Sequence, residues 1–369
     1  MITVQLTQSS LTRLIGRNTK KGIGWITFLL VCLGHALWAQ VIYVDALKGD
    51  DQATGSVSQP VASLHKAVQL SYRLSGEGDI TIKLAPGLYV LSQLIKIQPS
   101  QRADTTRFTL EALIMPDDPA WKPASMPVIQ SISPNNLKTY FEHCAGLEIL
   151  RNKVSIRGVK FVGNANPSVE YYYPIERDSA NLKDLIVSQC LFIGERNWAP
   201  IQGAVYMEGA NTVQVDHCIF YHCKNALLLF YSAKGFSLTH SIIDGAYESA
   251  IWYGYKKEAD APFVFRNNII TGSDYFFLSS KSENHPLFTF SNSVITGNVH
   301  YMGVYDSGQG PTPYQRPGTH QERGIRKTGK VILNQVTPMG IPGNYLHPTA
   351  QSAGYDLGAG LFNVTLKKP

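Results

Sequence analysis

Apolar and polar residues alternate in short stretches along this chain, and the stretches recur at intervals of 23 to 31 residues. The decamers FVFRNNIITG at Phe263 and FTFSNSVITG at Phe288 are nearly identical. Weaker copies are VSIRGVKFVG at Val154, LIVSQCLFIG at Leu185, VQVDHCIFYH at Val213 and FSLTHSIIDG at Phe236. Each copy begins with alternating apolar residues, which predicts one strand, and the paired apolar residues after the turn-like pair predict a second.

A third apolar stretch often follows each decamer. These stretches are AVYM at Ala204, ALLLF at Ala226, AIWYG at Ala250 and FFLSS at Phe276. Three short strands in a period of this length predict a solenoid in which each repeat forms one coil. Stacked coils place equivalent residues ~4.8 Å apart. The fifth repeat position carries residues that suit a left-handed bend between strands, namely Gln189, His217, His240, Asn267 and Asn292.

This pattern resembles the right-handed parallel β-helix proteins of the pectate-lyase-like superfamily. Residues 41–71, VIYVDALKGDDQATGSVSQPVASLHKAVQLS, resemble the first strand, Gly-Asp-Asp turn and capping helix of secreted bacterial members. Ala67, Leu70 and Leu74 give that helix an apolar face. Residues 347–362, HPTAQSAGYDLGAGLF, resemble the closing segment. The resemblance implies an all-β fold, a single-stranded right-handed parallel β-helix with an N-terminal capping helix.

Two segments interrupt or follow this predicted domain, which we place at residues 40–362. Residues 303–345 are rich in Gly, Pro and basic residues, so we expect an extended loop before the last coil. Residues 363–369 are expected to form a C-terminal tail.

The N-terminal segment has the composition of a targeting sequence. Four basic residues precede the apolar run GWITFLLVCLG, and the small residue Ala39 follows. This order predicts a secretory signal peptide over residues 1–39, with an uncleaved N-terminal anchor as the alternative. The run is short for a membrane span. We therefore expect a secreted, periplasmic or cell-surface protein with no stable span after cleavage.

Charge and cysteine content narrow the function classes further. Removing those four basic residues lowers the formal net charge from +6 to +2, so no nucleic-acid partner is expected. Cys190 and Cys218 share a repeat position, which permits a disulfide or two packed free thiols, and we expect the thiols. His217, Cys218, His222 and Cys223 are residue types that bind zinc. Their repeat positions instead favour stacked turn and core residues.

Candidate substrate-binding residues lie in the longest insertion and in later coils. They are Tyr171, Tyr172, Tyr173, Arg177, Arg196, Trp252 and Tyr253. Aromatic faces beside carboxylates and a guanidinium bind sugars by stacking and by paired hydrogen bonds. The alternative for the insertion, residues 164–183, is a surface loop held by its own aromatic side chains.

Charged residues in successive coils suggest a reaction. In an acidic-polysaccharide lyase a cation neutralises the uronate carboxylate, and a nearby base removes the α-proton. The resemblance implies that carboxylates hold Ca²⁺ and that Lys or Arg acts as base, but no lyase motif matches residue by residue. We assign Glu248 and Asp274 to the metal and Lys256 or Lys257 to the base. The alternative is a solvated ladder of opposite charges.

The sequence therefore predicts a secreted carbohydrate-active β-helix protein. A polysaccharide lyase that cleaves uronate-containing polysaccharide by β-elimination is the first hypothesis. A non-catalytic polysaccharide-binding or surface protein is the alternative. Hydrolysis would need two carboxyl groups across the bond, and Asp216 and Asp244 fall at different repeat positions.

Overall fold

The structure is a computed structural model. It describes residues 40–365 except 76–77, 100–105, 140, 178, 180, 209–210, 231–234, 255–263, 281–287, 307–308 and 314–319. The predicted signal peptide, residues 1–39, lies outside the described residues.

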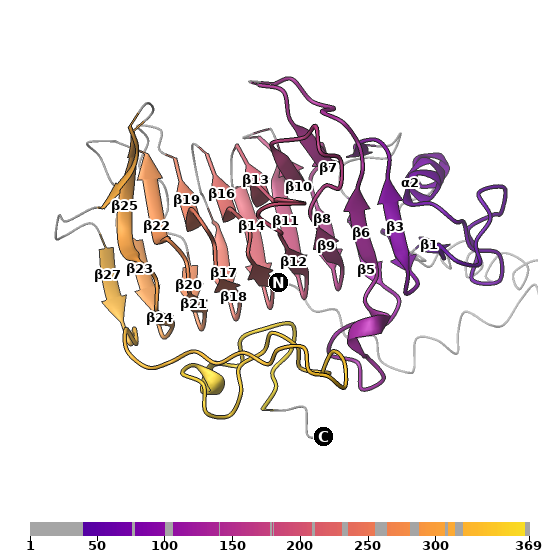
Figure 1. The fold of residues 1–369 in the computed structure, drawn as a ribbon. Helices are drawn as coiled ribbons and strands as arrows, with labels where there is room; N and C mark the ends of the chain where they lie inside the picture. Colours follow the sequence, from indigo (N-terminus) through magenta and orange to yellow (C-terminus); the bar gives the residue numbers. More distant parts are fainter. Residues whose placement is uncertain are drawn as a thin grey trace, which may run out of the picture. The chain divides into compact units, whose positions relative to one another are not determined.

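Short strands of the described residues stack into three sheets (Figure 1). The ten-stranded sheet contains, in spatial order, β1 (Gln40–Val44), β2 (Ile80–Leu84), β5 (Phe108–Ala112), β8 (Val154–Arg157), β11 (Lys183–Ser188), β14 (Asn211–Asp216), β17 (Ser237–Thr239), β20 (Val264–Arg266), β23 (Phe288–Ser291) and β27 (His320–Arg323). The nine-stranded sheet contains β4 (Ile95–Ile97), β7 (Cys144–Ile149), β10 (Tyr172–Arg177), β13 (Gly203–Met207), β16 (Asn225–Leu229), β19 (Ser249–Tyr253), β22 (Tyr275–Ser280), β25 (His300–Asp306) and β26 (Gly310–Pro313). The eight-stranded sheet contains β3 (Leu88–Leu91), β6 (Val128–Ser131), β9 (Lys160–Val162), β12 (Leu191–Ile193), β15 (Ile219–Tyr221), β18 (Ile242–Asp244), β21 (Ile269–Thr271) and β24 (Val294–Thr296).

The register of these sheets is the one that the repeats predict. Leu185, the first residue of one repeat, pairs with Val154 and Val213, the first residues of its neighbours. Strand pairs are parallel in these ladders, whereas β25 and β26 form an antiparallel hairpin. The chain visits the sheets in turn, so neighbouring strands of one sheet come from successive coils. The described domain is therefore a parallel β-helix.

The bend between the ten-stranded and eight-stranded sheets uses left-handed backbone at one residue per coil. Its φ values lie between 40° and 59° at the predicted turn residues Gln189, His217, His240, Asn267 and Asn292. Asn pays a smaller penalty than most residues in this conformation. The residue that follows each turn residue in the chain is also polar or small. It is buried, because it closes the turn against the neighbouring coil. Asn268, for example, accepts a hydrogen bond from the Ser241 N–H at 2.9 Å.

Apolar side chains fill the interior of the coils as stacked columns. Phe192 lies between Phe161 and Phe220, with ring centroids 5.0 and 4.8 Å apart and nearly parallel planes. Such columns follow from the parallel register, because equivalent residues of successive coils lie directly above one another. Each coil therefore buries its apolar face against the next.

Helix α2 (Leu64–Arg73) packs against the first strands of the solenoid, as the sequence predicts. Ser63 caps its first turn by accepting a hydrogen bond from the Lys66 N–H at 3.1 Å. Asp51 holds the segment before the helix by accepting from the Ala62 and Ser63 N–H groups at 2.9 and 2.8 Å. Leu64, Ala67 and Val68 are buried, so the helix covers core residues at the end of the stack.

The C-terminal part differs from the sequence expectation. Residues 303–345, expected to be an extended loop, contain the end of β25 and strands β26 and β27. After β27 the chain returns along the eight-stranded sheet (Figure 1). Leu346, Leu361 and Phe362 pack there on an outward-facing apolar column that contains Leu191, Ile219, Ile242, Ile269 and Val294. This column would otherwise face water, which is the physical reason for the returning segment.

Two short 3₁₀ helices, η1 (Pro123–Ser125) and η2 (Tyr355–Leu357), lie in connecting segments. In the described part of the chain, no helix combines the length and apolar character needed to cross a membrane.

Candidate functional site

A groove of about 770 Å³ lies on the outer face of the nine-stranded sheet. The alternation of strand residues creates it: Val205, Leu227 and Ile251 face the core, whereas the next residues face outward. Those outward residues are Tyr206, Leu228 and Trp252, and they line the groove. The apolar floor is therefore built by one repeat position of successive coils.

Aromatic rings form a continuous row along this groove. Tyr173 and Tyr206 lie 4.7 Å apart between ring centroids, and Phe230 lies 5.5 Å from Tyr206. Phe230 in turn contacts Trp252 at 4.5 Å, and Tyr305 of β25 lies 6.0 Å from Trp252. The five rings come from five of the six coils between β10 and β25, so the row offers apolar ring faces to an elongated ligand.

Polar groups lie along one edge of the row. The Glu248 carboxylate accepts a hydrogen bond from Asn225 Nδ2 at 2.6 Å, and Lys224 Nζ lies 3.7 Å from its other oxygen. Asn225 Oδ1 accepts from the Ser249 hydroxyl at 2.5 Å, which fixes the amide orientation. Gln202 and Asp306 also line the groove. The edge therefore presents amide, ammonium and carboxylate groups beside aromatic faces.

A buried hydrogen-bonded pair supports the end of the groove that Phe141 and Tyr173 line. His143 Nε2 lies 3.0 and 3.1 Å from the two Glu176 carboxylate oxygens. Both side chains are almost completely buried. The His143 ring lies 4.9 Å from the Phe141 ring and 5.4 Å from the Tyr173 ring. The pair thus fixes the imidazole against two groove residues.

The structure brings several predicted residues together in the groove. Tyr171, Tyr173, Trp252 and Glu248 all line it. Tyr171 contacts Phe141 at 5.3 Å, so the insertion contributes to one wall.

Three other predicted binding residues point elsewhere. Tyr172 and Tyr253 belong to the solenoid core, and their rings are buried there. Arg177 pairs in register with the core residue Met207 and is fully buried. Burial lowers the pKa of Arg177 to about 10. None of the three side chains offers the groove a surface, because strand alternation turns them inward.

The remaining described candidates, Arg196 and Asp274, do not line the groove. Arg196 is exposed, and its guanidinium lies 5.1 Å from the centre of the Tyr247 ring. Burial raises the pKa of Tyr247 to about 12, which keeps its hydroxyl protonated. Asp274 is exposed in the coil after Glu248. Lys256 and Lys257 lie outside the described residues.

A Ca²⁺ site at Glu248 does not fit these contacts. Ca²⁺ takes six to eight oxygen ligands. Here the two Glu248 oxygens face an amide N–H donor and the Lys224 ammonium. The Lys224 ammonium already stands where the metal charge would be, so the Glu248 carboxylate does not fit a Ca²⁺ site.

Tyr206, Phe230 and Tyr305 were not among the predicted site residues, although they form much of the aromatic row. The signal for Tyr206 is present in the sequence. AVYM, ALLLF and AIWYG align so that Tyr206, Leu228 and Trp252 share one outward repeat position. Tyr305 could not be found in this way, because it lies in the segment that lacks a clear repeat.

The cysteines of the described residues are all free and buried. Cys190 and Cys218 occupy adjacent rungs of the core, each beside backbone carbonyls. Among the described residues, Cys218, His222 and Cys223 do not belong to the cluster of possible metal ligands that contains His217.

Comparison with known families identifies the fold class. Residues 135–314 match the family model described as "Right handed beta helix region". This match and the three parallel sheets identify the described domain as a right-handed parallel β-helix, which confirms the fold predicted from the repeats.

Solved structures with similar folds are distant in sequence. One is pectate lyase Pel9A, with 14% identity, a TM-score of 0.44, and coverage of 80% of this chain and 78% of that chain. Another is a GH136 lacto-N-biosidase from Eubacterium ramulus, with 10% identity, a TM-score of 0.42, and coverage of 87% and 73%. A rhamnogalacturonan lyase has 11% identity, a TM-score of 0.41, and coverage of 88% and 100%. No curated protein matches the sequence.

Proposed function

We propose that the protein is carbohydrate-active and binds a polysaccharide chain in the groove of the nine-stranded sheet. The observation that carries this proposal is the row of aromatic rings from Tyr173 to Tyr305 beside the polar edge at Glu248. The apolar faces of sugar rings stack on aromatic side chains, while hydroxyl groups hydrogen-bond to carboxylates and amides. The predicted signal peptide supports action outside the cytoplasm, in the medium, the periplasm or at the cell surface.

The reaction we propose for this site is β-elimination on a uronate-containing chain. Lys224 would pair with the uronate carboxylate and make its α-proton more acidic. A base then takes the C5 proton, the C4–O bond breaks, and the electron pair forms the C4–C5 double bond. The leaving oxygen receives a proton and becomes the new chain end. Lys256 and Lys257, which follow the groove strand β19, remain the proposed base.

Binding is tested first, because it does not depend on the reaction. Full-length chain and its Trp252→Ala variant would be titrated with pectins, alginates and glycosaminoglycans by calorimetry. Removing one stacking ring is expected to weaken binding about 10-fold or more. Trp198→Ala is the matched control, since Trp198 is 82% exposed and does not line the groove. Equal affinity of Trp252→Ala and wild type for every ligand bound would overturn the groove assignment.

Turnover is tested on the same polymers, with Ca²⁺ and again with a chelator. Ultraviolet absorbance of unsaturated uronates and new reducing ends are followed together. Both signals, lost in Lys256→Ala or Lys257→Ala, are expected for β-elimination. Reducing ends without absorbance would indicate hydrolysis and contradict the proposed reaction. Binding without either signal would make the protein a non-catalytic polysaccharide-binding module.

A further inference from the structure

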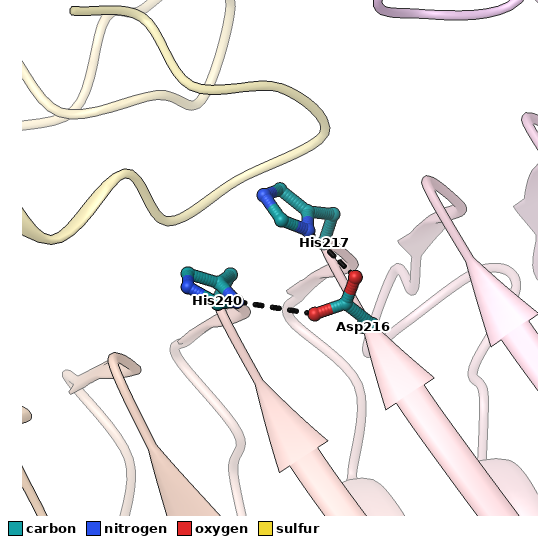
Figure 2. Close-up of side chains that lie close together, drawn as sticks. All are labelled: Asp216, His217 and His240. Carbon is teal, nitrogen blue, oxygen red and sulfur yellow. Dashed lines mark hydrogen bonds and ion pairs between the residues drawn. The ribbon is translucent and has the colours of Figure 1, made fainter.

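A second hollow, of about 810 Å³, lies on the outer face of the ten-stranded sheet. Most of its lining residues are polar, and they include three arginines, Arg107, Arg157 and Arg266. At one edge, where strands β14 and β17 end, three side chains meet: Asp216, His217 and His240 (Figure 2). None of these residues lines the aromatic groove.

The Asp216 carboxylate contacts both imidazole rings. Asp216 Oδ2 lies 2.8 Å from His217 Nδ1, and Oδ1 lies 3.2 Å from His240 Nδ1. Figure 2 shows the two rings side by side, each turned toward this carboxylate. The rings stack with centroids 4.7 Å apart and planes inclined by 14°. One potential ligand atom from each residue lies within 4.8 Å of the others.

Neighbouring side chains hold this arrangement. The Thr239 hydroxyl donates to Asp216 Oδ1 at 2.5 Å. Burial raises the pKa of the Asp216 carboxyl, but hydrogen bonds from His217, His240 and Thr239 outweigh it, so the pKa is lowered and the group is ionised. The Asn267 amide lies 2.9 Å from His240 Nε2 and 2.6 Å from the Asn292 amide. All three cluster residues are only half-buried, so an ion can reach them.

The fold does not require imidazole at these two positions. His217 and His240 occupy the left-handed turn position, with φ of 52° and 48°. Asn fills the same position at 267 and 292, with φ of 59° and 40°. Two adjacent coils thus carry imidazole, a stronger metal ligand than an amide, beside the Asp216 carboxylate, although Asn satisfies the same turn.

We propose that Asp216, His217 and His240 form a binding site for a divalent transition metal ion, of which Zn²⁺ is the representative. Two imidazole nitrogens and one carboxylate oxygen suit Zn²⁺, and sites with three protein ligands leave a fourth position open. Ca²⁺ and Mg²⁺ prefer oxygen ligands and do not suit this donor set. This site is independent of the proposed polysaccharide groove.

The side-chain amides of Asn267 and Asn292 can supply the hydrogen-bond acceptor that a metal-bound histidine needs. A metal-bound histidine donates its other ring N–H to a neighbouring acceptor. With the metal on His240 Nδ1, the Nε2–H would face Asn267. An Asn side chain presents either its oxygen or its nitrogen by rotating 180°. Asn267 and Asn292 turning together would offer Oδ1 to Nε2 and keep their mutual hydrogen bond.

The test measures metal binding directly and needs no substrate. Full-length chain without a histidine tag would be titrated with Co²⁺, followed by visible absorption, and with Zn²⁺ in competition. We expect one equivalent of metal per chain. His217→Asn and His240→Asn each keep the residue type that the turn uses elsewhere, and each is expected to weaken binding at least about 10-fold. Asp216→Asn, similar in shape but uncharged, is expected to do the same.

His222→Asn is the matched control. His222 also has left-handed backbone, with φ of 52°, but it stacks on Tyr221 and is not part of the cluster. It should bind metal like the wild type. Circular dichroism confirms that each variant is folded, and a variant that fails to fold is replaced by Asp216→Asn in the comparison. The proposal is wrong if the wild type binds no stoichiometric metal, or if His222→Asn weakens binding as much as His240→Asn.

Discussion

His143 and Glu176 form a buried hydrogen-bonded pair that joins the segment before β7 to strand β10, with Nε2 and Oε1 3.0 Å apart. His143 Nδ1 lies 2.9 Å from the Phe141 carbonyl oxygen, which can only accept, so Nδ1 carries a hydrogen. His143 Nε2 and the Glu176 carboxyl group therefore hold one proton between them. This contact positions Phe141 and Tyr173 at one end of the aromatic groove.

Breaking this pair should destabilise the fold. Removing one partner of this buried hydrogen-bonded contact takes away a hydrogen bond in the protein interior and costs about 1–3 kcal/mol. We expect His143→Ala to lower the free energy of unfolding by that order, measured by urea denaturation. Lys138→Ala is the control, because Lys138 pairs with Glu142 on the surface, and it should change stability by less than about 1 kcal/mol. Equal effects of the two substitutions would contradict the role assigned to the buried pair.

The buried polar side chain of Asn268 gives a second stability prediction. Its side chain accepts from the Ser241 N–H and donates to the Leu238 carbonyl, both at 2.9 Å. Asn268→Ala leaves a buried N–H without this acceptor, and we expect a loss of about 2 kcal/mol in the free energy of unfolding.

Asn268→Ser is the matched variant, because Ser293 at the next rung accepts from the Asn268 N–H in the same way. It should retain more stability than Asn268→Ala. If the Ser variant were as unstable as the Ala variant, the hydrogen bond to Ser241 would not account for the stability that Asn268 contributes.

Asp244 should make stability depend on pH. Burial raises its pKa, and nearby His222 lowers it less, so the folded chain holds this proton to a higher pH than the unfolded chain does. As pH rises above about 4, the unfolded state releases the proton first. The contribution of Asp244 to stability therefore falls with rising pH.

Asp244→Thr removes this titration and matches Thr271, its partner in the next coil. We expect the variant to gain stability over wild type at pH 7 and to gain less at pH 4, in denaturation at both values. The exposed Asp117→Thr serves as control and should show no such difference. A gain that is the same at both pH values would contradict the assignment to Asp244.

The buried cysteines should resist thiol reagents. Burial raises the pKa of Cys223 to about 12 and also raises the pKa of Cys144, so little reactive thiolate is present. A maleimide at pH 8 should leave Cys144, Cys190, Cys218 and Cys223 unlabelled in the folded chain and label all four in denaturant. Ser58→Cys, at an exposed position, provides the positive control. Mass spectrometry that found Cys190 linked to Cys218 would contradict two free thiols.

Much of the coil architecture could be read from the repeats, because a parallel solenoid places the same repeat position of each coil in one column. The pairing of Leu185 with Val154 and Val213 follows from this, and so does the left-handed turn at Asn267. The candidate groove contains some of the residues singled out in the sequence. Trp252 and Glu248 line it, whereas Tyr172 and Tyr253 face the core. Tyr172 lies in the insertion, where the repeat gives no register and a shift of one residue reverses the face. Tyr253 shares its repeat position with the core residues Met207 and Leu229, so its inward direction could be read from the repeat.

The sequence by itself determined the period, the strands of each coil, the capping helix and the residues at the bends, since these depend on local alternation and on contacts between equivalent positions. Only the tertiary structure decided which outward residues meet across coils. It brought Asp216 and His240 together from different strands, and it joined Tyr305 to the aromatic row. It also laid the C-terminal segment over the eight-stranded sheet. These contacts depend on side-chain direction and on loop paths, which no periodic pattern specifies.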